Sequence, residues 1–227
     1  VNALQTLLNE FPDYAVAYDH LSSVLLSEGR HDDLLQLHEM RLTALELEAA
    51  DVADTLVDIA ELYYSIHDDI PVTVERTIEA LRMVSDHPRA VALLEELISV
   101  EDVQQRIALA LEPVYQEREA LFRLADVLEI QLRWAEDYDQ EQLLRRLLDI
   151  YTTLENAGAA STTVQRLLKL VPEDAELKAR LETLAEELDD WFPVVALYGE
   201  LIADISNEGY RHEVMRSAAN IYHLQIG

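Results

Sequence analysis

Apolar residues recur at intervals of three and four positions along almost the whole chain. Leu56, Ile59, Ala60 and Tyr63 show this spacing, which places the apolar side chains on one side of a helix. Proline, glycine, asparagine and paired aspartates interrupt the pattern and mark helix ends. The pattern predicts an all-α fold of about a dozen helices, over residues 1–9, 13–28, 31–48, 51–67, 71–85, 88–99, 102–117, 119–136, 139–156, 159–170, 173–188, 190–205 and 208–225.

The connections between these predicted helices are very short. A short connection forces two successive helices to lie antiparallel, so the chain is predicted to form a series of helical hairpins. Hairpins that recur along a sequence stack side by side and bury their apolar faces against their neighbours. We therefore predict a curved, right-handed α-solenoid over residues 1–227.

Part of the sequence is repeated within the chain. The stretch 12–45 recurs as 172–205, displaced by 160 positions, so that Leu21 and Leu37 reappear as Leu181 and Leu197. Three prolines act as landmarks at Pro12, Pro88 and Pro172. We predict a repeat unit of roughly 80 residues that contains two hairpins of about 38 to 44 residues, with boundaries at 1–87, 88–171 and 172–227, the last of which spans only part of a unit. Because the chain opens inside a predicted helix, we expect it to be part of a longer array.

Aromatic residues also recur at equivalent places. The pairs Leu62-Tyr63, Ile150-Tyr151 and Ile221-Tyr222 lie near the ends of equivalent predicted helices. A tyrosine there can bury its ring between stacked hairpins while its hydroxyl reaches water or a carbonyl. We expect these tyrosines to be core spacers, and we favour packing between repeats over partner binding for Trp134 and Trp191.

The sequence pattern of these repeats resembles that of the tetratricopeptide repeat. It appears in the turn Ser27-Glu28-Gly29-Arg30 and again in Pro172-Glu173-Asp174-Ala175, followed by Leu181, Leu184, Asp190-Trp191 and Ala196-Leu197-Tyr198. It looks like the degenerate, long-period type found in large bacterial scaffolding proteins. The resemblance implies a non-catalytic scaffold for protein assembly. The predicted hairpins are longer than the family's usual repeat, its Trp-Leu-Gly-Tyr cluster is not intact, and its carboxylate-binding cluster of Lys, Arg and Asn has no counterpart.

The net charge of the chain excludes some classes of binding partner. There are 45 acidic and 17 basic residues, a net charge of -28, and lysine occurs only at Lys169 and Lys178. Nucleic acids and anionic membranes attract basic surfaces, so neither is a predicted partner. No apolar run is long enough to cross a bilayer. The acidity fits either a basic protein partner or simple solubility and adaptation to salt.

Candidate catalytic chemistry is sparse. His20, the pair His31-Asp32 and the run His67-Asp68-Asp69 match the residue types of a helical metal-dependent hydrolase. These aspartates also lie where helix N-caps are expected, and we favour capping. Asp137, Asp139 and Glu141 resemble a calcium loop, but Leu148 stands where the closing carboxylate belongs.

Other catalytic signatures are missing from the sequence. The chain has no cysteine, no Gly-x-Ser-x-Gly sequence and no glycine-rich phosphate loop. We therefore expect no enzymatic activity and no cofactor, and we assign no catalytic, cofactor-binding or metal-binding residue. The sequence does not identify the residues that bind a partner, and it carries no cue to the cellular location.

The sequence thus predicts a non-catalytic scaffold that binds or organises partner proteins through an extended acidic surface. Its groove would be lined by the first helix of each hairpin, and the partner would carry a basic helix or extended segment. Self-association through the solenoid ends is a further expectation. The alternatives are the His-Asp hydrolase and an architectural spacer in a large assembly.

Overall fold

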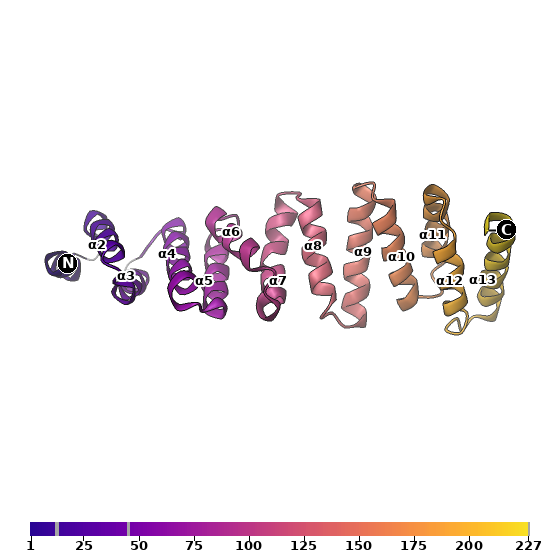
Figure 1. Ribbon diagram of the computed structural model, residues 1–227, viewed down its shortest axis with the longest axis horizontal. Helices are drawn as coiled ribbons and strands as arrows, with labels where there is room; N and C mark the ends of the chain where they lie inside the picture. Colours follow the sequence, from indigo (N-terminus) through magenta and orange to yellow (C-terminus); the bar gives the residue numbers. More distant parts are fainter. Residues whose placement is uncertain (12–13, 45, 227) are drawn as a thin grey trace. The chain divides into compact units, whose positions relative to one another are not determined.

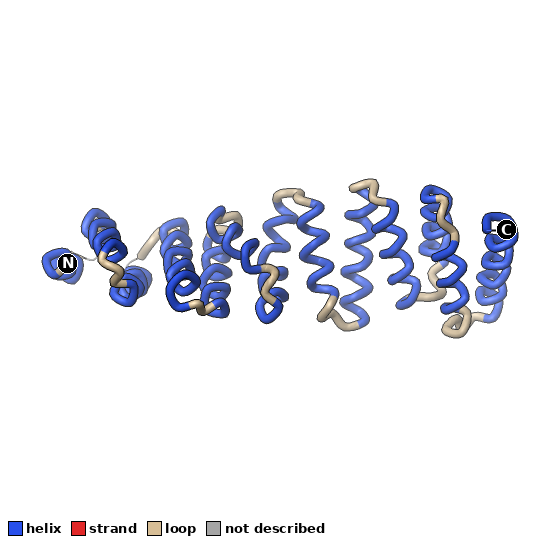
Figure 2. The backbone as a smooth tube through the Cα atoms, viewed as in Figure 1, coloured by secondary structure: helices blue, strands red, loops and turns tan. Residues whose placement is uncertain are grey.

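The computed structural model describes residues 1–227 except 12, 13, 45 and 227. The described residues form thirteen α-helices and two short π-helical segments, with no β-strand among them (Figures 1 and 2). Each predicted helix is present within a few residues of its expected bounds. The all-α prediction is therefore confirmed, whereas the landmark Pro12 and the end of the first repeat, Leu45, lie outside the described residues.

The chain divides into two compact units, 1–118 and 119–227. The first unit contains α1 (Asn2–Glu10), α2 (Ala15–Ser27), α3 (His31–Ala44), α4 (Ala49–Leu62), η1 (Tyr63–His67), α5 (Ile70–Met83), α6 (Pro88–Leu97) and α7 (Glu101–Glu117). The second contains α8 (Leu121–Leu132), α9 (Asp137–Thr153), α10 (Ala157–Leu170), α11 (Ala175–Leu188), α12 (Phe192–Leu201), α13 (Glu208–Ile221) and η2 (Tyr222–Ile226).

Helices within each unit pack on their neighbours in sequence. In the first unit α4 packs on α5, and in the second α10 packs on both α9 and α11. Contacts that skip one helix, as between α5 and α7 or between α10 and α12, connect successive pairs. This order of contacts is that of stacked hairpins. The predicted right-handed curvature and the division at residues 88 and 172 stay predictions.

Side-chain caps explain where several helices begin. Asp69, Asn156, Asp174 and Asn207 each accept a hydrogen bond from a backbone N–H two or three residues ahead, at 3.0 to 3.1 Å. Such bonds satisfy N–H groups that have no partner within the helix. The capping interpretation is confirmed at Asp69, whereas Asp32 and Asp33 lie in the first turn of α3.

Single residues in the left-handed conformation close the tightest turns. Gly29 has a φ of 68°, and four acidic residues adopt the same region, with φ between 51° and 54°: Asp68, Glu119, Glu155 and Asp189. A left-handed residue after a helix reverses the chain within a few positions. Gly29 and Asp189 are 160 positions apart, so the repeat extends to backbone conformation.

The internal repeat is visible in the helices themselves. Residues 49–67 form α4 and η1, and residues 208–226 form α13 and η2, the same succession of helix types displaced by 159 positions. The aligned leucines Leu21, Leu37, Leu181 and Leu197 are all buried. Residues that are aligned by the internal repeat therefore share both their type of helix and their burial.

The length of the helix pairs differs from the prediction. The first helices α2 and α4 begin at Ala15 and Ala49, and α9, α11 and α13 begin at Asp137, Ala175 and Glu208. Only the interval from α9 to α11 is as long as predicted, and the other two intervals are shorter. The prediction is wrong for those two intervals. Separately, the stretch from Pro88 to Pro172 holds five helices, α6 to α10, rather than the four predicted for one unit, so the proline spacing is a poor measure of hairpin length.

The recurring tyrosines are not all core spacers. Tyr63 and Tyr151 are half-buried, but Tyr222 is 58% exposed. The buried tyrosines are instead Tyr18, Tyr115 and Tyr198. Similarly, Trp191 is half-buried, whereas Trp134 is exposed at the end of α8. The position of an aromatic residue in the repeat determines the helix on which it lies. The burial of its side chain depends on which other helix packs against that helix.

The left-handed turns predict opposite effects of two substitutions. Glu155→Gly removes a side chain from a conformation that disfavours it, and we expect it to stabilise the second unit by about 1 kcal/mol. Gly29→Ala should destabilise the first unit by about the same amount. Thermal unfolding followed by circular dichroism measures both effects. A lower Tm for Glu155→Gly would contradict the interpretation.

Candidate partner-binding groove

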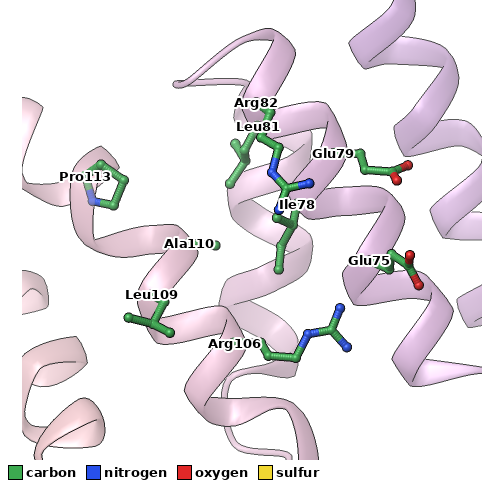
Figure 3. A pocket seen from close by; sticks show the side chains of 9 residues that line it. All are labelled: Glu75, Ile78, Glu79, Leu81, Arg82, Arg106, Leu109, Ala110 and Pro113. Carbon is green, nitrogen blue, oxygen red and sulfur yellow. The ribbon is translucent and has the colours of Figure 1, made fainter.

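The first unit contains a hollow of about 470 Å³ between α5 and α7 (Figure 3). Each helix contributes side chains at the spacing i, i+3, i+4 and i+7, which forms a stripe along one helix face. The lining residues are Glu75, Ile78, Glu79, Leu81 and Arg82 on α5, and Arg106, Leu109, Ala110 and Pro113 on α7. The hollow is thus an open groove between two helices.

The groove lies beside the faces that α5 and α7 use for packing. The helix α5 buries Val74, Thr77 and Ala80, and α7 buries Ile107 and Leu111. The Thr77 hydroxyl donates to the Thr73 carbonyl oxygen at 2.7 Å, so its burial leaves no unpaired group. Because these residues fix the two helices in the core of the unit, the groove has a rigid floor.

The position of the groove differs from the expectation that the first helix of each pair would line it. The helix α5 is the second of the pair that it forms with α4, and α7 follows the additional helix α6. The groove therefore coincides with the place where α6 interrupts the succession of pairs.

Proline changes the α7 side of the groove. Pro113 lies inside α7 and has no N–H to donate to the carbonyl of Leu109, four residues before it. The Leu109 side chain is 53% exposed at the same place. The groove edge thus combines an exposed apolar side chain with a carbonyl that lacks its usual helical donor.

The charged residues of the groove differ in their pairing. Arg76, next to the groove, donates to Glu79 at 3.1 Å and to Glu39 at 2.9 Å. Within the described part of the chain, neither Arg82 nor Arg106 forms an ion pair or a side-chain hydrogen bond. In the view of Figure 3 their guanidinium groups lie between Leu109 and Pro113 on one side and Glu75 and Glu79 on the other. These two cations are therefore free to bind an external anion.

A second hollow, of about 210 Å³, lies among α1, α2 and α3. Its lining includes Leu8, Leu21, Leu25 and Leu37, which belong to one buried apolar cluster of the first unit. The other half of its lining is Gln5, Asp33, Gln36 and Met40, so this smaller hollow opens from the core of the unit.

The candidate metal ligands do not assemble into a metal site. His20 is exposed on α2, and His31 is the first residue of α3. The His67 Nε2 atom lies 3.7 Å from an Asp32 carboxylate oxygen. Among the described residues, no group of three or more histidines and carboxylates could hold a metal ion. The histidines of the hydrolase alternative are therefore not brought into such a group.

The residues that resemble a calcium loop lie on a helix. Asp137 and Asp139 belong to the first turn of α9, where carboxylates favour the helix dipole. The Glu141 carboxylate accepts from Arg145 at 2.9 Å, an ordinary i, i+4 ion pair. These contacts account for the three acidic residues without a cation.

Sequence reasoning missed a buried polar pair in the first unit. The Tyr18 hydroxyl forms a hydrogen bond with His38 Nδ1, and the Arg41 guanidinium lies 4.1 Å from the centre of the Tyr18 ring. Burial lowers the pKa of His38; nearby Asp58 opposes this effect and Arg41 adds to it. Burial likewise raises the pKa of Tyr18. His38 is therefore held neutral in the folded protein.

The equivalent positions in the second unit keep a polar pair of different chemistry. Lys178 and Tyr198, each 160 positions further along, are both buried. The Tyr198 hydroxyl donates to Glu182 at 2.8 Å, and the Lys178 Nζ atom lies 3.2 Å from the same carboxylate. Burial and Glu182 raise the pKa of Tyr198. Buried polar groups at these positions are thus a repeated structural feature.

Comparison with known proteins gives remote structural matches only. No protein-family model matches the chain, and no curated protein matches it. A solved structure of MamA, residues 41 to the end, from Desulfovibrio magneticus RS-1 is 17% identical, with 90% of this chain and 97% of that chain covered and a TM-score of 0.31. A chain of the APC/C hetero-tetramer Cut9-Hcn1 is 11% identical, with 95% and 45% covered and a TM-score of 0.30.

These matches are too remote to support an argument about function. The architecture is nevertheless clear from the chain itself: it is an all-helical repeat of hairpins, similar to the tetratricopeptide repeat, as the resemblance in the sequence predicts. The separation between the starts of α2 at Ala15 and α4 at Ala49 matches the usual length of that repeat. In the described part of the chain, no helix has the length and apolar character needed to cross a membrane.

The neutral state of His38 predicts a dependence of stability on pH. Because its pKa is lower in the folded state, the unfolded chain takes up the proton first as the pH falls below about 6.5. We expect Tm to fall between about pH 8 and about pH 5, and the fall to be smaller in His38→Gln. The exposed His20→Gln variant is the matched control. Equal pH dependence in all three proteins would contradict the interpretation.

Proposed function

We propose that this protein is a non-catalytic scaffold that binds and organises partner proteins. The observation that carries this proposal is the stacking of helical hairpins that pack on their sequence neighbours and leave a groove between α5 and α7 open. Stacked repeats of this kind present extended, preformed surfaces and have no single central cavity for chemistry. Binding to a preformed surface avoids the entropic cost of ordering it.

Exposed aromatic side chains in the second unit support the proposal. Phe122, Tyr138 and Phe192 lie at the starts of α8, α9 and α12, and all three are largely exposed. Aromatic side chains provide much of the binding energy at protein interfaces. Large exposed rings at the starts of several helices fit a surface that contacts other proteins.

Charge gives this scaffold a preferred class of partner, a segment rich in arginine or lysine. If every basic residue compensated one carboxylate, 28 negative charges would remain. Several basic residues also bind more than one carboxylate, as Arg89 does with Asp58 at 2.7 Å and Glu61 at 2.8 Å. A uniform excess of one sign accelerates the association of oppositely charged partners.

Acidic residues at left-handed turns add to this argument. Glu155 and Asp189 occupy backbone positions where glycine is more stable, and a negative charge near a helix C-terminus opposes the helix dipole. Each carboxylate also lies within three residues of the start of the next helix, where a negative charge is favourable. A role in attracting a basic partner is consistent with their presence there.

A pair of matched peptides tests the charge preference. We expect a fluorescein-labelled amphipathic helical peptide with arginines on its polar face to bind the full chain, and the same peptide with glutamates to bind far less at this surface. Affinity for the arginine peptide should fall by about tenfold or more as ionic strength rises from about 0.01 M to about 0.15 M. Fluorescence anisotropy measures both. Affinity that does not change with ionic strength, or the absence of binding, would favour the alternative that the chain is an architectural spacer in a large assembly.

Self-association through α13 and η2 belongs to the same proposal. Leu56 of α4 is 5% exposed, whereas Met215, its equivalent on α13, is 45% exposed. Tyr222 and Leu224 of η2 are also exposed. An apolar helix face of this kind favours stacking on another helix pair.

Substitution of this face tests self-association. We expect the wild-type chain to form dimers or larger species at high concentration, and Met215→Glu to shift the equilibrium toward monomer because a charge opposes apolar contact. Leu26→Glu, at an exposed apolar residue of α2, is the control. Sedimentation velocity over a wide concentration range measures the change, and identical profiles for wild type and Met215→Glu would count against this interface.

A further inference from the structure

We propose that the groove between α5 and α7 binds a short segment of another protein in which carboxylate side chains flank an apolar centre. This site prefers the opposite charge from the acidic surface of the proposed function, and it rests on that proposal only in that the chain binds partner proteins. The occupant is recognised by side-chain carboxylates and an apolar contact, each of which corresponds to a feature of the groove lining.

The two guanidinium groups determine the charge of the occupant. In a chain with 45 acidic and 17 basic residues, carboxylates are available almost everywhere. Arg30, Arg145 and Arg166 each bind a carboxylate at 3.3 Å or less. Arg82 and Arg106, both exposed, have no such partner within the described residues, although both line the groove. Their planar groups remain available for bidentate contact with an incoming carboxylate.

The carboxylates of the lining do not pair with these two cations. Glu79 accepts from Arg76 at 3.1 Å, and Arg76 also donates to Glu39 at 2.9 Å. The lining therefore holds two glutamates and two arginines, and neither guanidinium group has a carboxylate partner among the described residues. The negative charge of the rest of the chain would repel any acidic segment that did not engage both arginines.

The apolar residues determine the centre of the occupant. The apolar lining residues are Ile78 on α5 and Leu109, Ala110 and Pro113 on α7. Figure 3 shows Ile78 and Ala110 between Arg82 and Arg106. Leu109 is largely exposed, so covering it removes apolar surface from water. The stripe from Glu75 to Arg82 is roughly 10 Å long at about 1.5 Å per residue, which suits an occupant of about two helical turns.

An unbiased peptide selection tests the proposal. A displayed library of random peptides of about a dozen residues is selected on the full chain, and the enriched peptides are synthesised and measured by fluorescence anisotropy. We expect enrichment of peptides with acidic residues on both sides of one or two large apolar residues. Their affinity should fall by about tenfold or more in the double variant Arg82→Gln/Arg106→Gln, since charge-assisted hydrogen bonds are lost.

Three further proteins complete the test. Arg216→Gln makes the same change at an exposed arginine of α13 and should leave the affinity unchanged. Arg82→Lys/Arg106→Lys keeps the charge and should restore part of the affinity, and Leu109→Ala should weaken binding without changing the preference for acidic residues. Circular dichroism confirms that each variant folds.

Several results would overturn the proposal. They are the absence of enriched peptides, enriched peptides without acidic residues, and acidic peptides that bind the glutamine double variant as tightly as wild type. Enrichment of basic, salt-sensitive peptides alone would overturn this site while supporting the acidic surface. Conversely, acidic peptides whose affinity depends on Arg82 and Arg106, with no salt-sensitive binding of basic peptides, would support this site and contradict the acidic surface. The two proposals can therefore fail separately.

Discussion

The burial of each apolar helix stripe against the next helix in sequence is the constraint on which both units depend. A single helix of about 14 residues cannot remain folded alone in water, because nucleation is unfavourable and most helix stability comes from packing. The left-handed residues Gly29, Asp68, Glu155 and Asp189 bring the next helix back within a few positions. Local turn geometry thereby sets which helices pack together within each unit.

The helices themselves were predictable from the sequence for physical reasons. Proline at Pro71 and Pro88 and capping residues such as Asn156 and Asn207 act within one helical turn, so their effect on a helix start does not depend on the rest of the fold. The length of the repeat was harder to predict from the sequence. The additional helix α6 has the same local signals as any other helix, and nothing in its own sequence distinguishes an insertion from half of a pair.

The groove was not predictable from the sequence because it depends on differences between similar residues. Arg76 and Arg82 lie on the same helix, yet one reaches Glu39 on α3 and the other reaches no carboxylate in the described part of the chain. The spacing of 106, 109, 110 and 113 on α7 is that of an ordinary packing stripe, and only Pro113 signals an irregular helix. Burial patterns such as that of Tyr222 are similarly decided by neighbouring helices.

The uncompensated charges of the scaffold have opposite signs and act over different distances. The general negative charge acts over a Debye length, about 8 Å at physiological ionic strength, and weakens as salt rises. The guanidinium groups of Arg82 and Arg106 act only in direct contact, where hydrogen-bond geometry and exclusion of water make an ion pair effective. A partner with a basic region and a short acidic-apolar segment would gain attraction from the first and orientation from the second. Under the two proposals, the acidic surface would repel segments that do not engage the groove, and the two features together would give selectivity that neither charge sign gives alone.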